Sequence, residues 1–320
     1  MIDAAEICDL LGPEARCNEP MSEHTTLRIG GPADAYVAVH SVIELVGAVR
    51  VARTAGAPCF LLGEGANLLV ADTGIRGVVI ENRAAHVIVR CQTDGITVFA
   101  ESGAPLADLA RYLTRRGIGG LEWAVDVPGS VGGAVVGNAG AYGGRMSDLV
   151  RQVSALTLQN EIATLNAEDI GFGYRTSKLK EEGARSSDRT VVLSVEMLLC
   201  WGVREVLEGK AAQYSKRRWE RQPPEPSAGS IFKRTADYPA GYLVEQAGLK
   251  GLRLGQAQIS PRHANVIINL GGAQAQDART LMEIARLVVR ERFGQVLEAE
   301  IELAGEWPPQ AETLPPWKAT

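Results

Sequence analysis

The stretch VPGSVGGAVVGNAGAYGG (127–144) contains seven glycines among its eighteen residues. Glycine loses more backbone entropy on folding than any other residue, so such a cluster is costly unless the chain bends sharply or touches something closely. Two interpretations compete. Either the small residues allow two elements of the protein to pack tightly, or their bare N–H groups approach a large anionic ligand.

A second glycine-containing stretch, GEGANLLV (63–70), directly follows the predicted strand 58–62. Gly63 and Gly65 permit a tight turn that aims successive N–H groups at an anion, and Asn67 can add a side-chain donor. Turns with two glycines at a strand end are common, so this signal alone is weak. Beside 127–144, about sixty residues further on, it favours two loops that clamp one extended dinucleotide from both sides.

Length and composition set the outer limits. The 320 residues suit two or three sub-domains, and 46% hydrophobic with 22% charged residues is ordinary for a soluble globular protein. The net charge of −5 argues against general polyanion binding. The first twenty residues have no signal-peptide pattern, and no apolar run approaches the ~18 residues of a membrane span. We therefore expect a cytoplasmic protein.

The cysteines show no CxxC spacing, which excludes the common zinc patterns and predicts reduced thiols at all five positions: Cys8, Cys17, Cys59, Cys91 and Cys200. GxGxxG, GxxxxGK[ST], HExxH and GxSxG are all absent. A Rossmann fold, a P-loop, a zinc protease and a serine hydrolase are therefore not supported, and we predict no metal site.

Periodicity predicts mixed α and β structure. The first third reads as a β-α-β unit (33–39, 43–56 and 58–62). Two strands follow at 86–90 and 96–101, joined by a hairpin turn at TDG (93–95), and then an amphipathic helix at 105–117, with further strands around 153–158 and 190–199.

The last third carries a helix at 277–293 that stops at Gly294 and a strictly alternating strand at 296–303. The expected apolar side of that strand holds Leu297, Ala299, Ile301 and Leu303. The predicted fold class is α+β.

Eight motifs occur in order between residues 18 and 305 with compatible spacing. They are NEPMSEHTTLRIGGPADAY (18–36), LLGEGANLLV (61–70), VPGSVGGAVVGNAGAYG (127–143), FGYRTSK (172–178), PSAGSIFKR (226–234), AGLKG (247–251), HANVIIN (263–269) and LEAEIEL (297–303). With this set the chain resembles the UDP-N-acetylenolpyruvoylglucosamine reductase family of bacterial cell-wall synthesis. The spacing between Tyr174 and Tyr214 resembles the branch that lacks a tyrosine-bearing lid loop.

The resemblance implies a vanillyl-alcohol-oxidase/PCMH-type FAD-binding fold of two sub-domains plus a C-terminal α+β substrate domain. The expected division is an N-terminal extension (1–20), FAD sub-domains (21–85 and 86–214), a UDP-sugar domain (215–305) and a proline-rich tail (306–320). The FAD contacts that it implies are Gly63, Glu64, Gly65, Ala66, Asn67, Leu68, Pro128, Gly129, Ser130, Gly133, Asn138, Ala139, Gly140 and Ala141. GEGANLL lacks the histidine that tethers flavin in some proteins of this fold, so non-covalent FAD is expected.

The resemblance also implies the reaction. NADPH reduces the FAD, and the enolpyruvyl ether of UDP-N-acetylglucosamine then accepts a hydride from flavin N5, giving UDP-N-acetylmuramate, a peptidoglycan precursor needed for cell shape and division. Arg175 would stabilise the enolate-like charge, since a guanidinium forks onto a carboxylate. Ser230 would donate the proton, and Glu300 would lie with the reacting carboxylate.

The substrate contacts implied by the resemblance are Tyr174, Arg221, Lys250, His263 and Arg234. Arg221 ends the basic run KRRWER (216–221), which otherwise reads as an exposed helix face. We expect a monomer that binds the UDP-sugar and NADPH, with no nucleic-acid or membrane partner. Two alternatives stay open: another FAD-dependent oxidoreductase of the same fold, and a non-catalytic UDP-sugar-binding paralogue.

Overall fold

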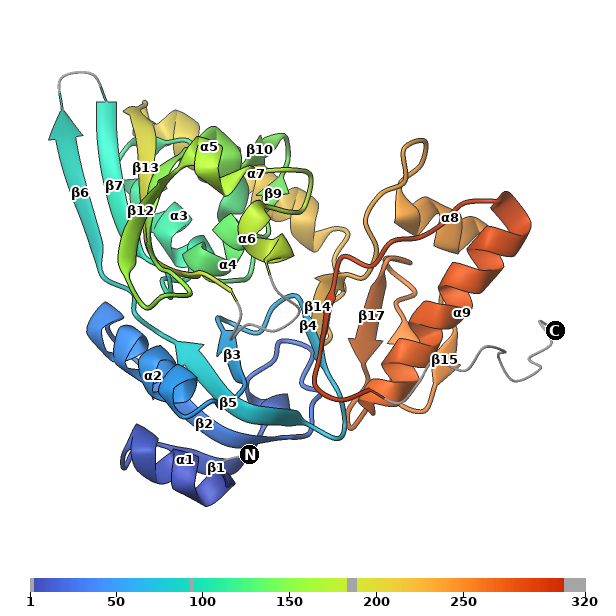
Figure 1. Ribbon diagram of the computed structural model, residues 1–320. Coiled ribbons are helices and arrows are strands. Elements are labelled where there is room, and N and C mark those ends of the chain that lie inside the picture. Colours follow the sequence, from blue (N-terminus) through green and yellow to red (C-terminus); the bar gives the residue numbers. More distant parts are fainter. Residues whose placement is uncertain (1–2, 93–94, 183–188, 308–320) are drawn as a thin grey trace. The chain divides into compact units, whose positions relative to one another are not determined.

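The computed structural model describes residues 3–92, 95–182 and 189–307, and the chain forms two compact units. Unit 1 contains the chain up to Glu19 together with Ala33–Ala66 and Gly77–Arg221. Unit 2 contains Pro20–Pro32, Asn67–Arg76 and the chain from Gln222 onward. Each unit is therefore assembled from segments that are far apart in the sequence (Figure 1).

The first sheet of unit 1 has the strand order β1-β2-β5-β3, with β3 and β5 parallel. Helices α1 and α2 lie next to it (Figure 1), and their apolar side chains share a core with β2, β3 and β5. Ser41 begins α2 by accepting a hydrogen bond from the Glu44 N–H. The bounds are β1 Arg16–Pro20, β2 Pro32–Val39, β3 Cys59–Leu62, β5 Ile75–Asn82, α1 Ala4–Leu11 and α2 Val42–Thr54.

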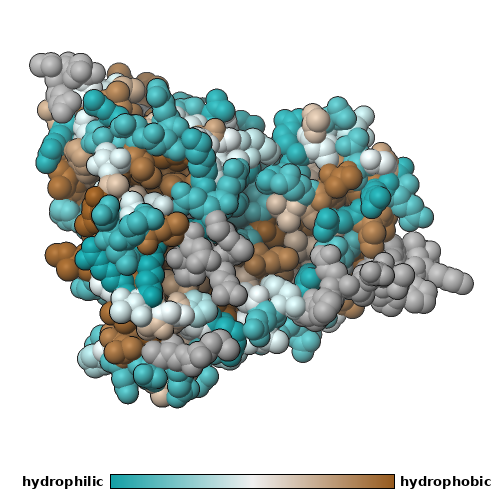
Figure 2. Space-filling view, viewed as in Figure 1, coloured by the Kyte–Doolittle hydropathy of each residue, from teal (hydrophilic) through white to brown (hydrophobic). Residues whose placement is uncertain are grey.

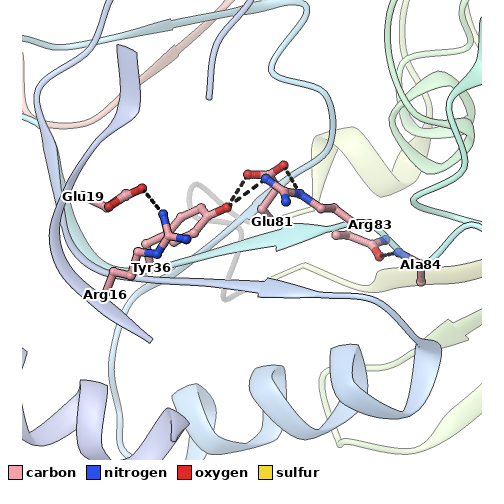
Figure 3. A network of polar contacts seen from close by, with 7 residues as sticks. Arg16, Glu19, Tyr36, Glu81, Arg83 and Ala84 are labelled. Carbon is pink, nitrogen blue, oxygen red and sulfur yellow. Dashed lines mark hydrogen bonds and ion pairs between the residues drawn. The ribbon is translucent and has the colours of Figure 1, made fainter. Parts of the chain in front are cut away.

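A polar network joins three strands of this sheet (Figure 3). The buried Tyr36 donates its hydroxyl to Glu81 at 2.5 Å, and Arg83 pairs with the other oxygen of Glu81 at 2.6 Å. Arg16, held by Glu19, lies over the Tyr36 ring. Burial and the hydrogen bond to Glu81 raise the pKa of Tyr36, so its hydroxyl stays a neutral donor.

Tyr36→Phe is expected to lower the free energy of unfolding by about 1.5–3 kcal/mol, because it removes one hydrogen bond to a charged group. Chemical denaturation with and without the substitution measures this. Val37→Ala on the same strand provides a control for loss of packing alone. A stability equal to that of the unsubstituted protein would contradict an energetic role for the network.

The second sheet of unit 1 is antiparallel, with the order β12-β11-β13-β7-β6 and β8 attached to β13. Leu106, Leu109 and Leu113 of α3 are buried in the core of this sheet, as the predicted apolar stripe requires. Strands β6 and β7 pair as the predicted hairpin does, while Thr93 and Asp94 of its turn lie outside the described residues. The bounds are β6 Val87–Gln92, β7 Gly95–Glu101, β8 Ile118–Gly119, β11 Val150–Leu156, β12 Ile162–Asn166, β13 Val191–Trp201 and α3 Leu106–Arg115.

Shorter elements and one long helix complete unit 1. The long helix is α7 Arg204–Trp219. The short elements are α4 Val131–Val136, α5 Ala167–Ile170, α6 Lys178–Glu181, the strand pair β9 Gly140–Ala141 and β10 Gly144–Arg145, and the 3₁₀ turns η2 Glu122–Ala124 and η3 Met146–Asp148.

Unit 2 is built on a four-stranded antiparallel sheet with the order β14-β17-β16-β15. Helix α9 packs against it (Figure 1), and its residues Leu281, Ala285 and Val288 are buried in the core of unit 2. Gly294, at φ 66°, ends α9 as predicted. The bounds are β14 Ser227–Ser230, β15 Arg253–Leu254, β16 Ala257–Ile259, β17 Val266–Asn269, α8 Ala240–Gln246, α9 Ala275–Phe293, η1 Met21–Glu23 and the parallel pair β4 Leu68–Val70 and β18 Glu302–Ala304.

The structure corrects two predictions. Cys8 and Cys17 are joined by a disulfide, whereas reduced thiols were expected; Cys59, Cys91 and Cys200 are free. The predicted strand 296–303 is a strand only at Glu302–Ala304, with one isolated bridge at Ala299. The side chains of Leu297 and Ile301 are buried, but those of Ala299 and Leu303 are exposed, because the segment has a short partner strand instead of a sheet face beneath it.

On the face drawn in Figure 2, hydrophilic residues predominate and hydrophobic residues form small scattered groups. Among the described residues, no helix has the length and apolar character that crossing a membrane requires. Of the predicted tail (306–320), only Glu306 and Trp307 lie among the described residues. The guanidinium of Arg279 lies 5.0 Å from the centre of the Trp307 ring.

Candidate functional site

The two glycine-rich loops meet in unit 1. The Gly129 N–H donates to the Glu64 carboxylate at 2.6 Å. A side chain at Gly63 would overlap the Ser130 hydroxyl, so the bare backbone of Gly63 lies against the Ser130 side chain. Ser130 also accepts the Gly133 N–H at 3.2 Å and thereby begins α4. Unit 1 therefore contains the predicted cofactor residues Gly63–Ala66 of the first loop and all the predicted cofactor residues of the second loop.

The packing interpretation of the 127–144 stretch is correct at some of its glycines, while others have open space beside them. Gly132, Gly140 and Gly144 serve packing, because a Cβ there would press against Ser102, against the Gly144–Arg145 strand and against Trp123, respectively. Gly129 and Gly143 have φ angles of 123° and 91°, which glycine alone adopts at low cost. A Cβ at either position would meet open space, with Ala66 no nearer than 4.0 Å from Gly129.

Gly132→Ala is expected to lower the free energy of unfolding by about 1–3 kcal/mol, since the added methyl group would lie 2.8 Å from the Ser102 Cβ. Gly133→Ala is the matched comparison, because its Cβ would meet only the Ser130 hydroxyl at an ordinary 3.4 Å. It should leave the flavin-free protein as stable, or about 0.5–1 kcal/mol more so. Thermal unfolding of both apo-proteins tests this, and equal destabilisation would contradict it.

The basic end of α7 packs on the glycine stretch within unit 1. Tyr142, which precedes Gly143, stacks on Tyr214 with ring centres 4.7 Å apart, and the guanidinium of Arg217 lies 5.3 Å from the Tyr142 ring centre. Burial lowers the pKa of Arg218, while Tyr142 and Asp126 act in the opposite direction. The run KRRWER therefore combines exposed cations with the half-buried Arg218.

Arg175 lies in a two-residue turn that is closed by the Gly173 N–H, which donates to the Thr176 carbonyl at 3.0 Å. Its φ angle of 58° is unusual for a residue with a side chain and costs on the order of 1–3 kcal/mol. Its guanidinium lies 5.9 Å from the ring centre of Tyr174, which is 56% exposed. Such strain persists only where neighbouring contacts enforce it.

Unit 2 brings Ser230 and Glu300 together. Ser230 ends β14 and pairs with Val266 of β17. The Glu300 N–H donates to the carbonyl of Ile231, the next residue after Ser230, at 2.9 Å. Residues seventy apart in the sequence thus lie on adjacent backbone, both half-buried. Arg175 belongs to the other unit.

Asn67, the last residue of GEGAN (63–67), is hydrogen-bonded to the backbone around Glu300. Its side-chain amide donates to the Glu300 carbonyl at 2.9 Å, and its own carbonyl accepts the Glu302 N–H at 2.9 Å. The sequence predicted Asn67 as a donor to an anion. In the structure this donor binds the Glu300 carbonyl instead. Asn67 and Leu68 belong to unit 2, whereas Gly63–Ala66 belong to unit 1.

The predicted substrate residues are divided between the units. Tyr174 and Arg221 belong to unit 1. His263 lies in the turn before β17, where its Nδ1 accepts the Asn265 N–H at 3.2 Å. Lys250 pairs with Glu245 at 3.0 Å, and Arg234 is exposed. No described contact joins Lys250 or Arg234 to Ser230.

Sequence reasoning missed Asn265. This buried side chain accepts the Phe232 N–H at 3.1 Å and donates to the Phe232 carbonyl at 2.8 Å, so it clamps the backbone two residues after Ser230. The signal available was HANVIIN (263–269), in which polar asparagines interrupt an apolar strand. Tyr142 was missed as well, although it is the one aromatic residue in the 127–144 stretch.

The glycine loops leave space beside their backbone for a ligand to approach closely. The two loops of unit 1 meet where the Gly129 N–H donates to Glu64, and a Cβ at Gly129 or Gly143 would meet no atom nearer than 4.0 Å. Among the described residues, no group of three or more His, Cys, Asp or Glu side chains could hold a metal ion. The sequence matches the FAD-binding domain family over residues 33–166, which includes both loops. The fold and site therefore define a flavoprotein oxidoreductase that uses FAD.

The C-terminal part of the chain shows to which family of flavoproteins it belongs. Residues 222–304 match the C-terminal domain of UDP-N-acetylenolpyruvoylglucosamine reductase. Such reductases from Symbiobacterium thermophilum and Syntrophomonas wolfei are 43% and 40% identical to this chain, covering 91% and 94% of it and 92% and 99% of their own lengths. The chain belongs to the UDP-N-acetylenolpyruvoylglucosamine reductase family.

A solved structure agrees. The crystal structure of the reductase from Thermus caldophilus is 33% identical, with a TM-score of 0.74, and the match covers 91% of this chain and 98% of that one. The resemblance, the α+β class and the FAD-binding fold predicted from the sequence are confirmed.

Proposed function

We propose that this protein reduces the enolpyruvyl ether of UDP-N-acetylglucosamine to UDP-N-acetylmuramate with NADPH. The observation that carries the proposal is the presence, in one chain, of the FAD-binding domain and the reductase C-terminal domain in the order and length of its relatives. FAD, when bound by the glycine loops of unit 1, would supply the redox chemistry that links NADPH oxidation to reduction of the enolpyruvyl double bond. The protein must position the substrate and manage charge.

Arg175 is the residue that we assign to the charge that develops on the substrate carboxylate. A guanidinium is always ionised and can form two parallel hydrogen bonds to a carboxylate. Ser230 delivers the proton that completes reduction of the double bond. Glu300 lies on the backbone next to Ser230, where Asn67 and the Ile231 carbonyl fix its main chain. These positions support assigning the proton-transfer step to unit 2.

The residues that we assign to FAD and to the UDP-sugar are divided between the two units. FAD is held, without a covalent bond, by Gly63–Ala66 and by the loop residues Pro128, Gly129, Ser130, Gly133, Ala139, Gly140 and Ala141 of unit 1. Of the residues that we assign to the UDP-sugar, Tyr174 and Arg221 belong to unit 1, and Lys250, His263 and Arg234 belong to unit 2. Arg221, which follows α7, is assigned to the pyrophosphate. The protein works as a monomer in the cytoplasm and supplies the peptidoglycan precursor on which cell shape and division depend.

The purified protein should be yellow, with a flavin absorbance band at about 450 nm that bleaches when NADPH is added without oxygen. Adding the enolpyruvyl sugar nucleotide should restore the colour and yield UDP-N-acetylmuramate. A protein that binds the sugar nucleotide but stays colourless after incubation with FAD would disprove the proposal. Reoxidation by oxygen alone, with no effect of the sugar nucleotide, would indicate a different flavoenzyme.

A further inference from the structure

The turn that carries Arg175 is attached at both ends to the glycine stretch by two side chains. The Asn138 amide donates from Nδ2 to the Gly173 carbonyl at 2.8 Å. The Ser177 hydroxyl donates to the Val136 carbonyl at 2.7 Å. Both contacts lie within unit 1. Gly173 and Ser177 immediately flank the segment Tyr174–Thr176, so the two bonds secure Arg175 from either side.

Asn138, a residue that the sequence predicted to bind the cofactor, has both ends of its side-chain amide hydrogen-bonded within the protein. Its Oδ1 accepts the Ser147 N–H at 3.0 Å, and its backbone N–H donates to the Val135 carbonyl at 3.0 Å. The residue is 6% exposed and has a φ angle of 43°. Asparagine tolerates this left-handed conformation better than most residues. Its side chain therefore joins three segments of backbone to one another.

Ser177 gives independent support. It occupies the N-cap position of α6, where a serine usually accepts a hydrogen bond from its own helix. Instead its hydroxyl reaches across to the last residue of α4, and the residue is fully buried. The side chain thus forgoes a local cap and fixes the Arg175 turn to the glycine stretch.

We infer that Asn138 and Ser177 are positioning residues for Arg175: they hold its strained turn against the loop that binds FAD, so that the guanidinium is preset for the substrate carboxylate. This rests on the proposed function. A backbone conformation as costly as that of Arg175 needs contacts that over-determine it, and these two hydrogen bonds supply them. The inference gives the Asn138 side chain a role different from the FAD contact expected from the sequence.

Asn138→Asp tests the inference. Aspartate tolerates the same backbone conformation and keeps the oxygen that accepts from the Ser147 N–H. It replaces the amide donor to the Gly173 carbonyl by a carboxylate oxygen, which cannot donate and is repelled by that carbonyl. We expect reoxidation of the reduced flavin by the enolpyruvyl substrate to slow by about 10²-fold, the order that a ~1 Å misplacement produces. Flavin content and the rate of flavin reduction by NADPH should stay unchanged. Stopped-flow absorbance in single turnovers separates the two half-reactions.

Two comparisons sharpen the test. Ser177→Ala should slow the same half-reaction without any substitution inside the glycine stretch, which covers the case in which Asn138→Asp disturbs folding. Asn160→Asp is the matched control: Asn160 also has a left-handed φ, 64°, in unit 1, and its Oδ1 accepts from Arg53, which an aspartate preserves. It should alter neither half-reaction.

A double substitution decides whether Asn138 acts through Arg175. In an Arg175→Lys background, Asn138→Asp should add less than about threefold, because the group it positions is already lost. Full multiplication of the two effects, or loss of flavin from Asn138→Asp, would overturn the inference. Wild-type rates in both Asn138→Asp and Ser177→Ala would also overturn it. If the unsubstituted protein does not respond to the sugar nucleotide, the proposed function itself fails, which is a separate result.

Discussion

Ser230→Ala is expected to slow reduction of the enolpyruvyl substrate by about 10²–10⁴-fold, the contribution of a positioned proton donor. Flavin reduction by NADPH should proceed at the wild-type rate, because that half-reaction does not use this proton. The pairing of Ser230 with Val266, and of the next residue with Glu300, is made by backbone atoms. The substitution therefore removes the hydroxyl and leaves the strand in place.

Ser227→Ala, on the same strand, is the control and should leave both half-reactions unchanged. Single-turnover kinetics with pre-reduced enzyme measure the effect. If Ser230→Ala slowed both half-reactions equally, its assignment as the proton donor would be wrong, since such loss would point to damage of the flavin site.

Arg175→Lys is expected to lower kcat by about 10²–10³-fold, as for loss of a group that stabilises developing charge. A lysine ammonium is a point charge and cannot copy the two-pronged contact of a guanidinium with a carboxylate. The effect should fall on reaction with the enolpyruvyl substrate and not on flavin reduction by NADPH. Arg151→Lys, at an exposed arginine of the same unit, is the control and should have little effect.

Arg175→Gly adds an independent check, because glycine adopts the φ of 58° without strain. This protein should be at least as stable as the wild type and yet lose activity, with partial rescue by free guanidinium ions. A fall in stability together with activity would mean that the Arg175 side chain serves mainly to hold the fold.

Much of the local structure followed from sequence periodicity. The α3 stripe and the stop of α9 at Gly294 were predicted correctly, because amphipathic spacing and a left-handed glycine act over a few residues. The strand at 296–303 was predicted too long. Its alternation implied a sheet face, but alternation does not reveal whether a partner strand of that length exists. The disulfide was missed for a similar reason, since scattered cysteine spacing does not tell which two side chains meet.

For the candidate site, too, the motifs predicted some features, while other features became visible only in the structure. The sequence predicted both glycine loops, Arg175, Ser230 and Glu300 as site residues from their motifs, and these assignments stay predictions. It did not tell that Asn67 supports Glu300, that Asn138 and Ser177 secure the Arg175 turn, or that Asn265 clamps the backbone after Ser230. An asparagine amide has the same appearance in a sequence whether it faces a ligand or a distant carbonyl.

By itself, the sequence determined the family, the FAD chemistry and the positions of the glycines, because these depend on residue types in a fixed order. Only the tertiary structure decided which glycines serve packing and which face open space, since that depends on neighbours such as Ser102 and Trp123 from other segments. It also decided which polar side chains are occupied within the protein. Hydrogen bonds between segments far apart in the chain form only when folding places a donor within about 3 Å of its acceptor.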